Sequence, residues 1–319
     1  MPHLHTFQNI EISSITLSDE WNLHPFLPPD PSSRLRQSIQ TIGLLHPIIL
    51  KKSPGNRHQL LCGRNRLRSL QSDRHPPTLI NALILDEGIE ARRLLHYILE
   101  DQLLSGTLSP MEKAYFFKYC LEHMELEEAA NYFFPILEEN VQPHMILRVL
   151  LLLDLEAEIQ KSIHLGETGE KIALELRQLT PDDRLTLHRI FQELELGGGK
   201  QKRLLALTKD LAFGQDKTIT ALLAEPDLTL ILDHPEMNRP QKASTLLAIL
   251  QKRLSPQSNT AEEIFQKTVH KMQLPAACTI CHSPAFEKDE VYVTLRFDSL
   301  TEVENQLDGL KSLATGKEE

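Results

Sequence analysis

The chain has 319 residues, of which 41% are hydrophobic and 24% charged, and its net charge is −10. That length predicts roughly two or three domains with sizeable cores. The acidic balance excludes a protein that binds nucleic acid indiscriminately. Four cysteines suit a reducing compartment, and no apolar run is long enough for a membrane span. The first residues lack the basic flank and apolar core of a signal peptide, so we expect a cytoplasmic protein without membrane contact.

The first hundred residues alternate between helical and strand patterns. Apolar residues recur at helical spacing over 35–42, and Gly43 stands where a C-terminal cap belongs. A helix is also expected over about 89–103. Short apolar runs bounded by turn residues predict strands over 44–50, 58–62 and 78–85. This order predicts an α/β domain.

An anion site is predicted where the second of these strands ends. The strand leads into Gly63, and Arg64, Arg66 and Arg68 follow at once on a helix. Glycine lets another group approach the backbone closely, and the N-terminus of a helix presents unpaired N–H groups. With arginines added, the pattern favours phosphate binding. The alternative is that a basic first turn is only a solvated helix face.

Helices are expected throughout the middle of the chain. Ser109 to Glu112 form a capping box with proline at the first helical position, which predicts a helix up to about residue 124. A similar start at Thr180 predicts a helix that stops at the hinge-like Gly197-Gly198-Gly199. Further helices are expected over about 200–213, 217–224 and 240–253, and a linker over 255–260.

The last residues change character. Apolar and polar residues alternate over 291–297, which predicts a half-buried strand, and Ser299 begins an amphipathic helix that carries Leu307 and Leu310. Cys278 and Cys281 could serve in a zinc or redox site. The favoured alternative is that they are an incidental pair of half-buried thiols, because structural zinc takes four ligands and no second pair lies at finger spacing.

Charge is distributed unevenly along the chain. From residue 34 to 93 there are eleven Lys or Arg against four acids, whereas from 122 to 158 there is one Arg against nine acids. The basic field therefore lies on the α/β domain and not on the helical region that follows it.

Three ordered motifs carry a family resemblance. Gly63-Arg64-Asn65-Arg66-Leu67-Arg68-Ser69 compares with Gly-Glu-Arg-Arg-x-Arg-Ala, and Glu100-Asp101-Gln102-Leu103-Leu104 compares with Glu-Asn-x-x-Arg. Residues 108–114 match Leu-x-Pro-x-Glu-x-Ala. Together with the helix–Gly–x–x–His–Pro–strand order before them, they resemble the ParB/Spo0J chromosome-partition family, whose N-terminal domain is related in fold to sulfiredoxin. The resemblance covers about residues 10–195.

The resemblance implies an α+β protein with four parts. These are a ParB/sulfiredoxin-like nucleotide-binding α/β domain (1–107), a helix-turn-helix-like domain (108–196), a helical extension (197–260) and a small module of β-strand plus helix (261–319). The last part either dimerises, as the resemblance implies, or packs on its own chain.

The resemblance also implies a site for CTP with Mg²⁺. The residues implied for the nucleotide are His46, Gly63, Arg64, Asn65, Arg66, Arg68 and Glu100, and those for the metal are Glu100 and Asp101. Arg64, Asn65, Asp101 and Leu104 depart from the family motifs. We therefore expect weakened or modified CTP binding and slow or absent hydrolysis. Sulfiredoxin chemistry is not expected because Cys62 precedes Gly63, and two adjacent acids do not specify a nuclease.

DNA binding is implied by the same resemblance. The helix-turn-helix would comprise 125–132 and 141–152, with Gln142, His144 and Arg148 facing DNA. The expected function is a CTP-dependent, dimeric DNA-binding or clamp protein of chromosome or plasmid partition, associated with the nucleoid and with a partition ATPase. The alternative is an adaptor that keeps the fold and no longer reads DNA. The acidic, leucine-rich character of 122–158 favours this alternative, because a recognition helix needs polar and basic side chains at its first turn.

Overall fold

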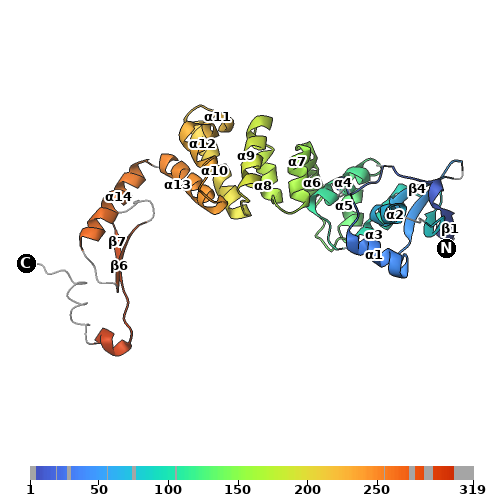
Figure 1. The fold of residues 1–319 in the computed structure, drawn as a ribbon, viewed down its shortest axis with the longest axis horizontal. Coiled ribbons are helices and arrows are strands. Elements are labelled where there is room, and N and C mark those ends of the chain that lie inside the picture. Colours follow the sequence, from blue (N-terminus) through green and yellow to red (C-terminus); the bar gives the residue numbers. More distant parts are fainter. Residues whose placement is uncertain are drawn as a thin grey trace, which may run out of the picture. The chain divides into compact units, whose positions relative to one another are not determined.

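The computed structural model describes residues 5–18, 20–26, 30–55, 57–73, 77–104, 106–254, 256–272, 277–283 and 290–304. The chain divides into two compact units, residues 1–202 and 203–319. The first contains a five-stranded sheet and the helices that follow it, and the second is mostly helical (Figure 1). Nowhere in the described residues is a helix long and apolar enough to cross a bilayer.

A mixed sheet forms the start of the first unit. Its strand order is β1-β5-β3-β4-β2. β3 and β5 run parallel, as do β2 and β4, whereas β1 and β5, and β3 and β4, are antiparallel. The strands are β1 (His5–Glu11), β2 (Ile15–Thr16), β3 (Ile48–Ser53), β4 (Arg57–Cys62) and β5 (Leu79–Leu85). The strands predicted over 58–62 and 78–85 are confirmed as β4 and β5. The strand predicted over 44–50 begins only at Ile48, after Pro47, and continues to Ser53 as β3. Sequence patterns do not predict β1 and β2.

Both faces of the sheet are covered by helices. Successive residues of a strand point to opposite sides, so each strand contributes side chains to both buried faces. Ile48 and Leu50 belong to a cluster with Leu67 and Leu70 of α2 (Arg64–Gln71). α1 (Ser33–Ile42) adds Ile39 to the same cluster. On the opposite face Ile49, Leu61, Leu83 and Leu85 pack with α3 (Ala91–Leu103). The sheet is therefore covered by α1 and α2 on one side and by α3 on the other.

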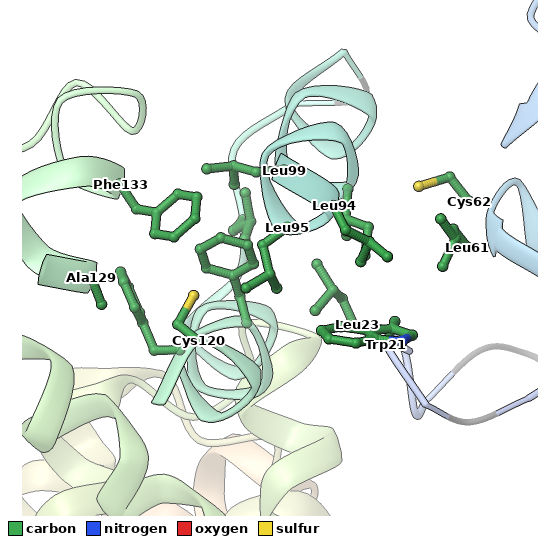
Figure 2. Packing of buried hydrophobic residues seen from close by; sticks show 14 of the residues in the cluster. Trp21, Leu23, Leu61, Cys62, Leu94, Leu95, Leu99, Cys120, Ala129 and Phe133 are labelled. Carbon is green, nitrogen blue, oxygen red and sulfur yellow. The ribbon is translucent and has the colours of Figure 1, made fainter. Parts of the chain in front are cut away.

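The second of these clusters continues into the helices that follow. Leu94, Leu95 and Leu99 of α3 lie between Leu61 and Cys62 on one side and Ala129 and Phe133 on the other (Figure 2). The helices of this region are α4 (Pro110–Leu121), α5 (Leu126–Phe133), α6 (Pro143–Leu150), α7 (Ala157–His164), α8 (Glu170–Leu176) and α9 (Pro181–Glu193). One hydrophobic core thus joins the sheet to α4, α5 and α6.

Helix starts follow the capping residues. Ser109 accepts a hydrogen bond from the Glu112 N–H, and the Glu112 carboxylate accepts one from the Ser109 N–H, so the predicted capping box is confirmed. Thr180 caps α9 in the predicted way, through the N–H of Asp183. The two segments predicted for a helix-turn-helix are helical, as α5 and α6, although α6 ends at Leu150 and continues as a short 3₁₀ turn, Leu151–Asp154.

The second unit is built from helices and a β-hairpin. α10 (Gly198–Gly214) begins within the glycine triplet and carries the chain into this unit. There follow α11 (Ile219–Leu223), α12 (Pro226–Leu232), α13 (Arg239–Leu254), α14 (Pro256–Lys271), β6 (Cys278–His282) and β7 (Val291–Leu295). β6 and β7 pair antiparallel.

Two predictions for this unit are corrected. The linker predicted over 255–260 is helical from Pro256 onward, because α14 begins there. The strand β7 was predicted to be half-buried, but all its residues are exposed, since the hairpin presents it to solvent. The predicted last helix is seen over 300–304, and its apolar residues Leu307 and Leu310 lie outside the described residues.

Candidate phosphate-binding cleft

A cleft of about 490 Å³ opens in the first unit where β4 leads into α2. Gly63, Arg64, Asn65 and Arg66 line it from the start of α2, and Asp101 lines it from α3. Glu112 of α4 and His164 of α7 contribute from the helical region. This volume lies in the range of small-molecule sites, and most of the residues predicted for the phosphates meet in it.

Gly63 determines how the backbone turns at this point. It adopts the left-handed conformation, with φ 93° and ψ 27°, and it has no side chain to cap α2. A Cβ atom here would lie 2.9 Å from Ile48 Cγ2 and 3.0 Å from Arg66 Nε. Glycine is therefore required both by the turn and by the close approach of the Arg66 side chain.

Arg66 is held by four hydrogen bonds. Its Nη1 donates to the carbonyl oxygens of His46 and Pro47, at 3.2 and 2.8 Å. Its Nη2 donates to both carboxylate oxygens of Asp101, each at 3.0 Å. His46 thus reaches the site through its backbone as well as lining the cleft. Asp101 stands where the family motif has Asn, so the replacement supplies the charge that binds Arg66.

The other predicted phosphate residues have different surroundings. Arg64 donates to the carbonyl oxygen of Ser18 while also lining the cleft. Arg68 lines a separate hollow with Leu17 and Gln71. Asn65 Oδ1 is buried in the wall of the cleft without a hydrogen-bond partner among the described residues. A buried amide oxygen normally accepts a hydrogen bond, so this atom requires a donor and does not itself bind a phosphate oxygen, which is also an acceptor.

Glu100 and Asp101, predicted as a metal pair, contact different partners. Glu100 accepts from His96 Nε2 at 3.2 Å, whereas Asp101 faces Arg66. Adjacent residues on a helix point about 100° apart, which explains the separation. In the part of the chain that the structure describes, no group of three or more His, Cys, Asp or Glu side chains could hold a metal ion. Asp101 lines the cleft and Glu100 does not, so the two carboxylates predicted for Mg²⁺ do not converge on one point in this structure.

His24 and Glu112 join the two walls of the cleft. His24 Nδ1 lies 2.7 Å from Glu112 Oε1, and His24 Nε2 lies 2.7 Å from Gln102 Oε1. Burial acts to raise the pKa of Glu112, but hydrogen bonds from His24 and the Ser109 N–H outweigh it and hold the pKa below its ordinary value. On the same side, Ser109 Oγ is bonded to His164 Nδ1 at 3.0 Å.

These residues were not predicted as part of the site. His24 and His164 belong to no motif, whereas Gln102 and Glu112 lie within motifs that predicted no role for them at the cleft. They come together through packing between segments that are distant in sequence, for which a single sequence carries no local signal.

The residues predicted to face DNA lie on α6 or at its start. Gln142 is the N-cap residue and His144 is exposed, but Arg148 Nε lies 2.9 Å from Glu170 Oε1 of α8. The exposed side of this segment also carries apolar side chains, with Leu147 51% and Val141 43% exposed. Basic groups for phosphate or base contacts are therefore scarce here.

Cys278 and Cys281 lie on β6 as free thiols. Three positions apart on a strand, they point to opposite faces, which separates the two thiols. Cys62, the cysteine nearest the arginines, is buried beside Asp101, and burial followed by the Asp101 charge raises the pKa of its thiol.

Several solved structures match this chain. One is the C-terminally truncated chromosome-partitioning protein ParB from Caulobacter crescentus complexed to the centromeric parS site. It is 18% identical, and the match covers 62% of this chain and 98% of that one with a TM-score of 0.34. The same protein complexed with CTP-gamma-S is 18% identical over 58% and 97%, with a TM-score of 0.27. A pNOB8-like ParB N-domain is 16% identical over 79% and 98%, with a TM-score of 0.39.

No family model matches the chain, and no curated protein does. The matching structures are of the family that the three sequence motifs resemble. With identities of 16–18% and TM-scores below 0.4, this likeness carries no argument about function.

Proposed function

We propose that this chain is a ParB-like protein whose first unit binds a nucleotide, CTP by the family resemblance, with the phosphates at the start of α2. The observation that carries the proposal is the cleft itself. It combines a helix that opens after a left-handed glycine with the guanidinium groups of Arg64 and Arg66.

The position of the cleft suggests how a bound nucleotide would act. One wall belongs to α2 and α3, and Glu112 and His164 bring the helical region to the other. A ligand that contacts both walls favours whichever arrangement of the two gives it the better contacts. Within the family resemblance, the state favoured in this way is a dimer closed around DNA. We assign the nucleotide a ligand role only, because the two cleft carboxylates, Asp101 and Glu112, are engaged by Arg66 and His24.

Titration calorimetry tests this proposal. CTP is titrated first, and ATP, GTP and UTP are titrated separately to measure selectivity. We expect selective CTP binding that Arg66→Ala weakens by about tenfold or more, because charge-assisted hydrogen bonds to phosphate are lost. Arg189→Ala removes an exposed arginine paired only at 3.9 Å with Glu193 and should leave the affinity unchanged. An Arg66→Ala protein that binds CTP as tightly as the unsubstituted chain would contradict the site.

A second candidate function is an adaptor that binds proteins and not DNA. The observation that favours it is the Arg148–Glu170 ion pair beside the exposed Leu147 and Val141, where a DNA-reading helix needs free cations.

A mobility-shift assay over a salt series separates the two functions. A DNA clamp should bind with an affinity that falls steeply as salt rises, because phosphate contacts release counterions. In that case Glu170→Gln, which frees Arg148, should strengthen binding several-fold, and Arg148→Ala should weaken it. An adaptor should show no shift at moderate salt in any of the three proteins.

A further inference from the structure

Arg66 already holds an anion in this structure. Both oxygens of the Asp101 carboxylate accept from its Nη2, and its Nη1 is bonded to two backbone carbonyls. A phosphate that used this guanidinium would have to take the same donors. Two anions cannot share them without repulsion at short range.

The pair is held firmly in place. The side chains of Arg66 and Asp101 are only 19% and 18% exposed, so water screens their attraction less than at an open surface. Gly63 leaves the space in which the guanidinium lies, and the buried Cys62 thiol lies beside the Asp101 carboxylate. Asp101 is therefore positioned by two neighbours, Arg66 and Cys62, and Gly63 gives the guanidinium its place.

The charges of the cleft are balanced before a ligand enters. Arg64, Arg66, Asp101 and Glu112 all line it, and the charges of these two arginines and two carboxylates cancel. An asparagine at 101, as in the family motif, would leave one uncompensated arginine for a phosphate.

We propose that Asp101 is an internal competitor for Arg66, so that a phosphorylated ligand binds this cleft only by displacing the Asp101 carboxylate from the guanidinium. This inference rests on the proposed nucleotide-binding function. It adds that a carboxylate of the chain itself regulates the affinity of the cleft for phosphates. The neutral amide of Asp101→Asn keeps the shape of the side chain and removes the competing charge.

The test is a calorimetric titration of CTP into the full chain and into the Asp101→Asn variant. We expect the variant to bind about tenfold more tightly or better, which corresponds to about 1.4 kcal/mol. Asp86→Asn makes the same chemical change in the exposed ion pair with Lys52, and it should leave the affinity unchanged. In an Arg66→Ala background, Asp101→Asn should have no such effect, because the group for which the anions compete is missing.

The outcomes separate this inference from the function on which it rests. If the unsubstituted chain binds CTP and Asp101→Asn binds equally or more weakly, Asp101 is not a competitor and the nucleotide function stands. If neither protein binds any nucleotide, both are overturned. Trp21 fluorescence reports whether the variant is folded, and Asp101→Ser replaces it in the same titration if the amide prevents folding.

Discussion

Replacing Phe116 with alanine is expected to lower the free energy of unfolding of the first unit by about 3–5 kcal/mol. Phe116 is fully buried, and its ring meets Phe117 and Phe133 edge to face at centroid distances of 5.4 and 4.9 Å. The substitution removes the buried apolar surface and these ring contacts, and it leaves a cavity that the surrounding helices fill only in part.

The consequence reaches beyond the helices, because Phe116 belongs to the cluster that also contains Ile49 and Leu83 of the sheet. Trp21, the single tryptophan of the chain, lies in the same cluster and reports on its integrity. Urea unfolding of the first unit can be followed by Trp21 fluorescence and by far-ultraviolet circular dichroism. The midpoints measured by the two probes should therefore fall to the same lower urea concentration.

Phe7→Ala is the matched control within the same unit. Phe7 is 62% exposed, and its removal should change stability by no more than about 0.5 kcal/mol. A Phe116→Ala protein whose Trp21 transition stays in place while the helical signal melts earlier would show that the sheet and the helices fold separately.

The sequence predicts those strands and helices whose formation depends mainly on residues close together in the chain. β3, β4 and β5 are apolar runs bounded by turn residues, and α4 begins at a capping box that the structure reproduces in both directions. β1 could not be found in this way. Its sequence is largely polar and only Ile10 is buried, so its place at the sheet edge depends on pairing with β5.

The sequence predicts which residues lie at the candidate site, but it does not predict which of them form ion pairs with one another. Arg66 and Asp101 were both expected at the site, but one for phosphate and the other for metal. They are 35 positions apart, and their ion pair depends on how α2 and α3 meet past the end of β4. The same limit applies to Arg148, whose partner Glu170 lies on a helix that no motif connects with it. A sequence shows which charges are present, whereas the fold decides which of them neutralise one another.

Gly63→Ala is expected to cost about 2–4 kcal/mol of stability and to abolish nucleotide binding in the proposed cleft. Part of the cost arises because an alanine is strained at φ 93°. The rest arises because its Cβ would approach Ile48 Cγ2 to 2.9 Å and Arg66 Cζ to 3.1 Å. Ile48 is buried in the sheet and cannot withdraw easily, so the flexible guanidinium is the group that must move.

Gly166→Ala separates these two contributions. Gly166 also has a positive φ, 76°, but a Cβ there would meet nothing within 4 Å, so it should cost only the backbone strain of about 1–2 kcal/mol. The difference between the two variants in urea unfolding measures the contact at Gly63, and CTP titration of both shows whether that contact matters for binding. If Gly63→Ala costs no more than Gly166→Ala and still binds CTP, the close approach of Arg66 to the backbone is not what shapes the cleft. If only Gly63→Ala loses binding, the glycine is required because it lets the arginine lie against the chain where the phosphates would enter.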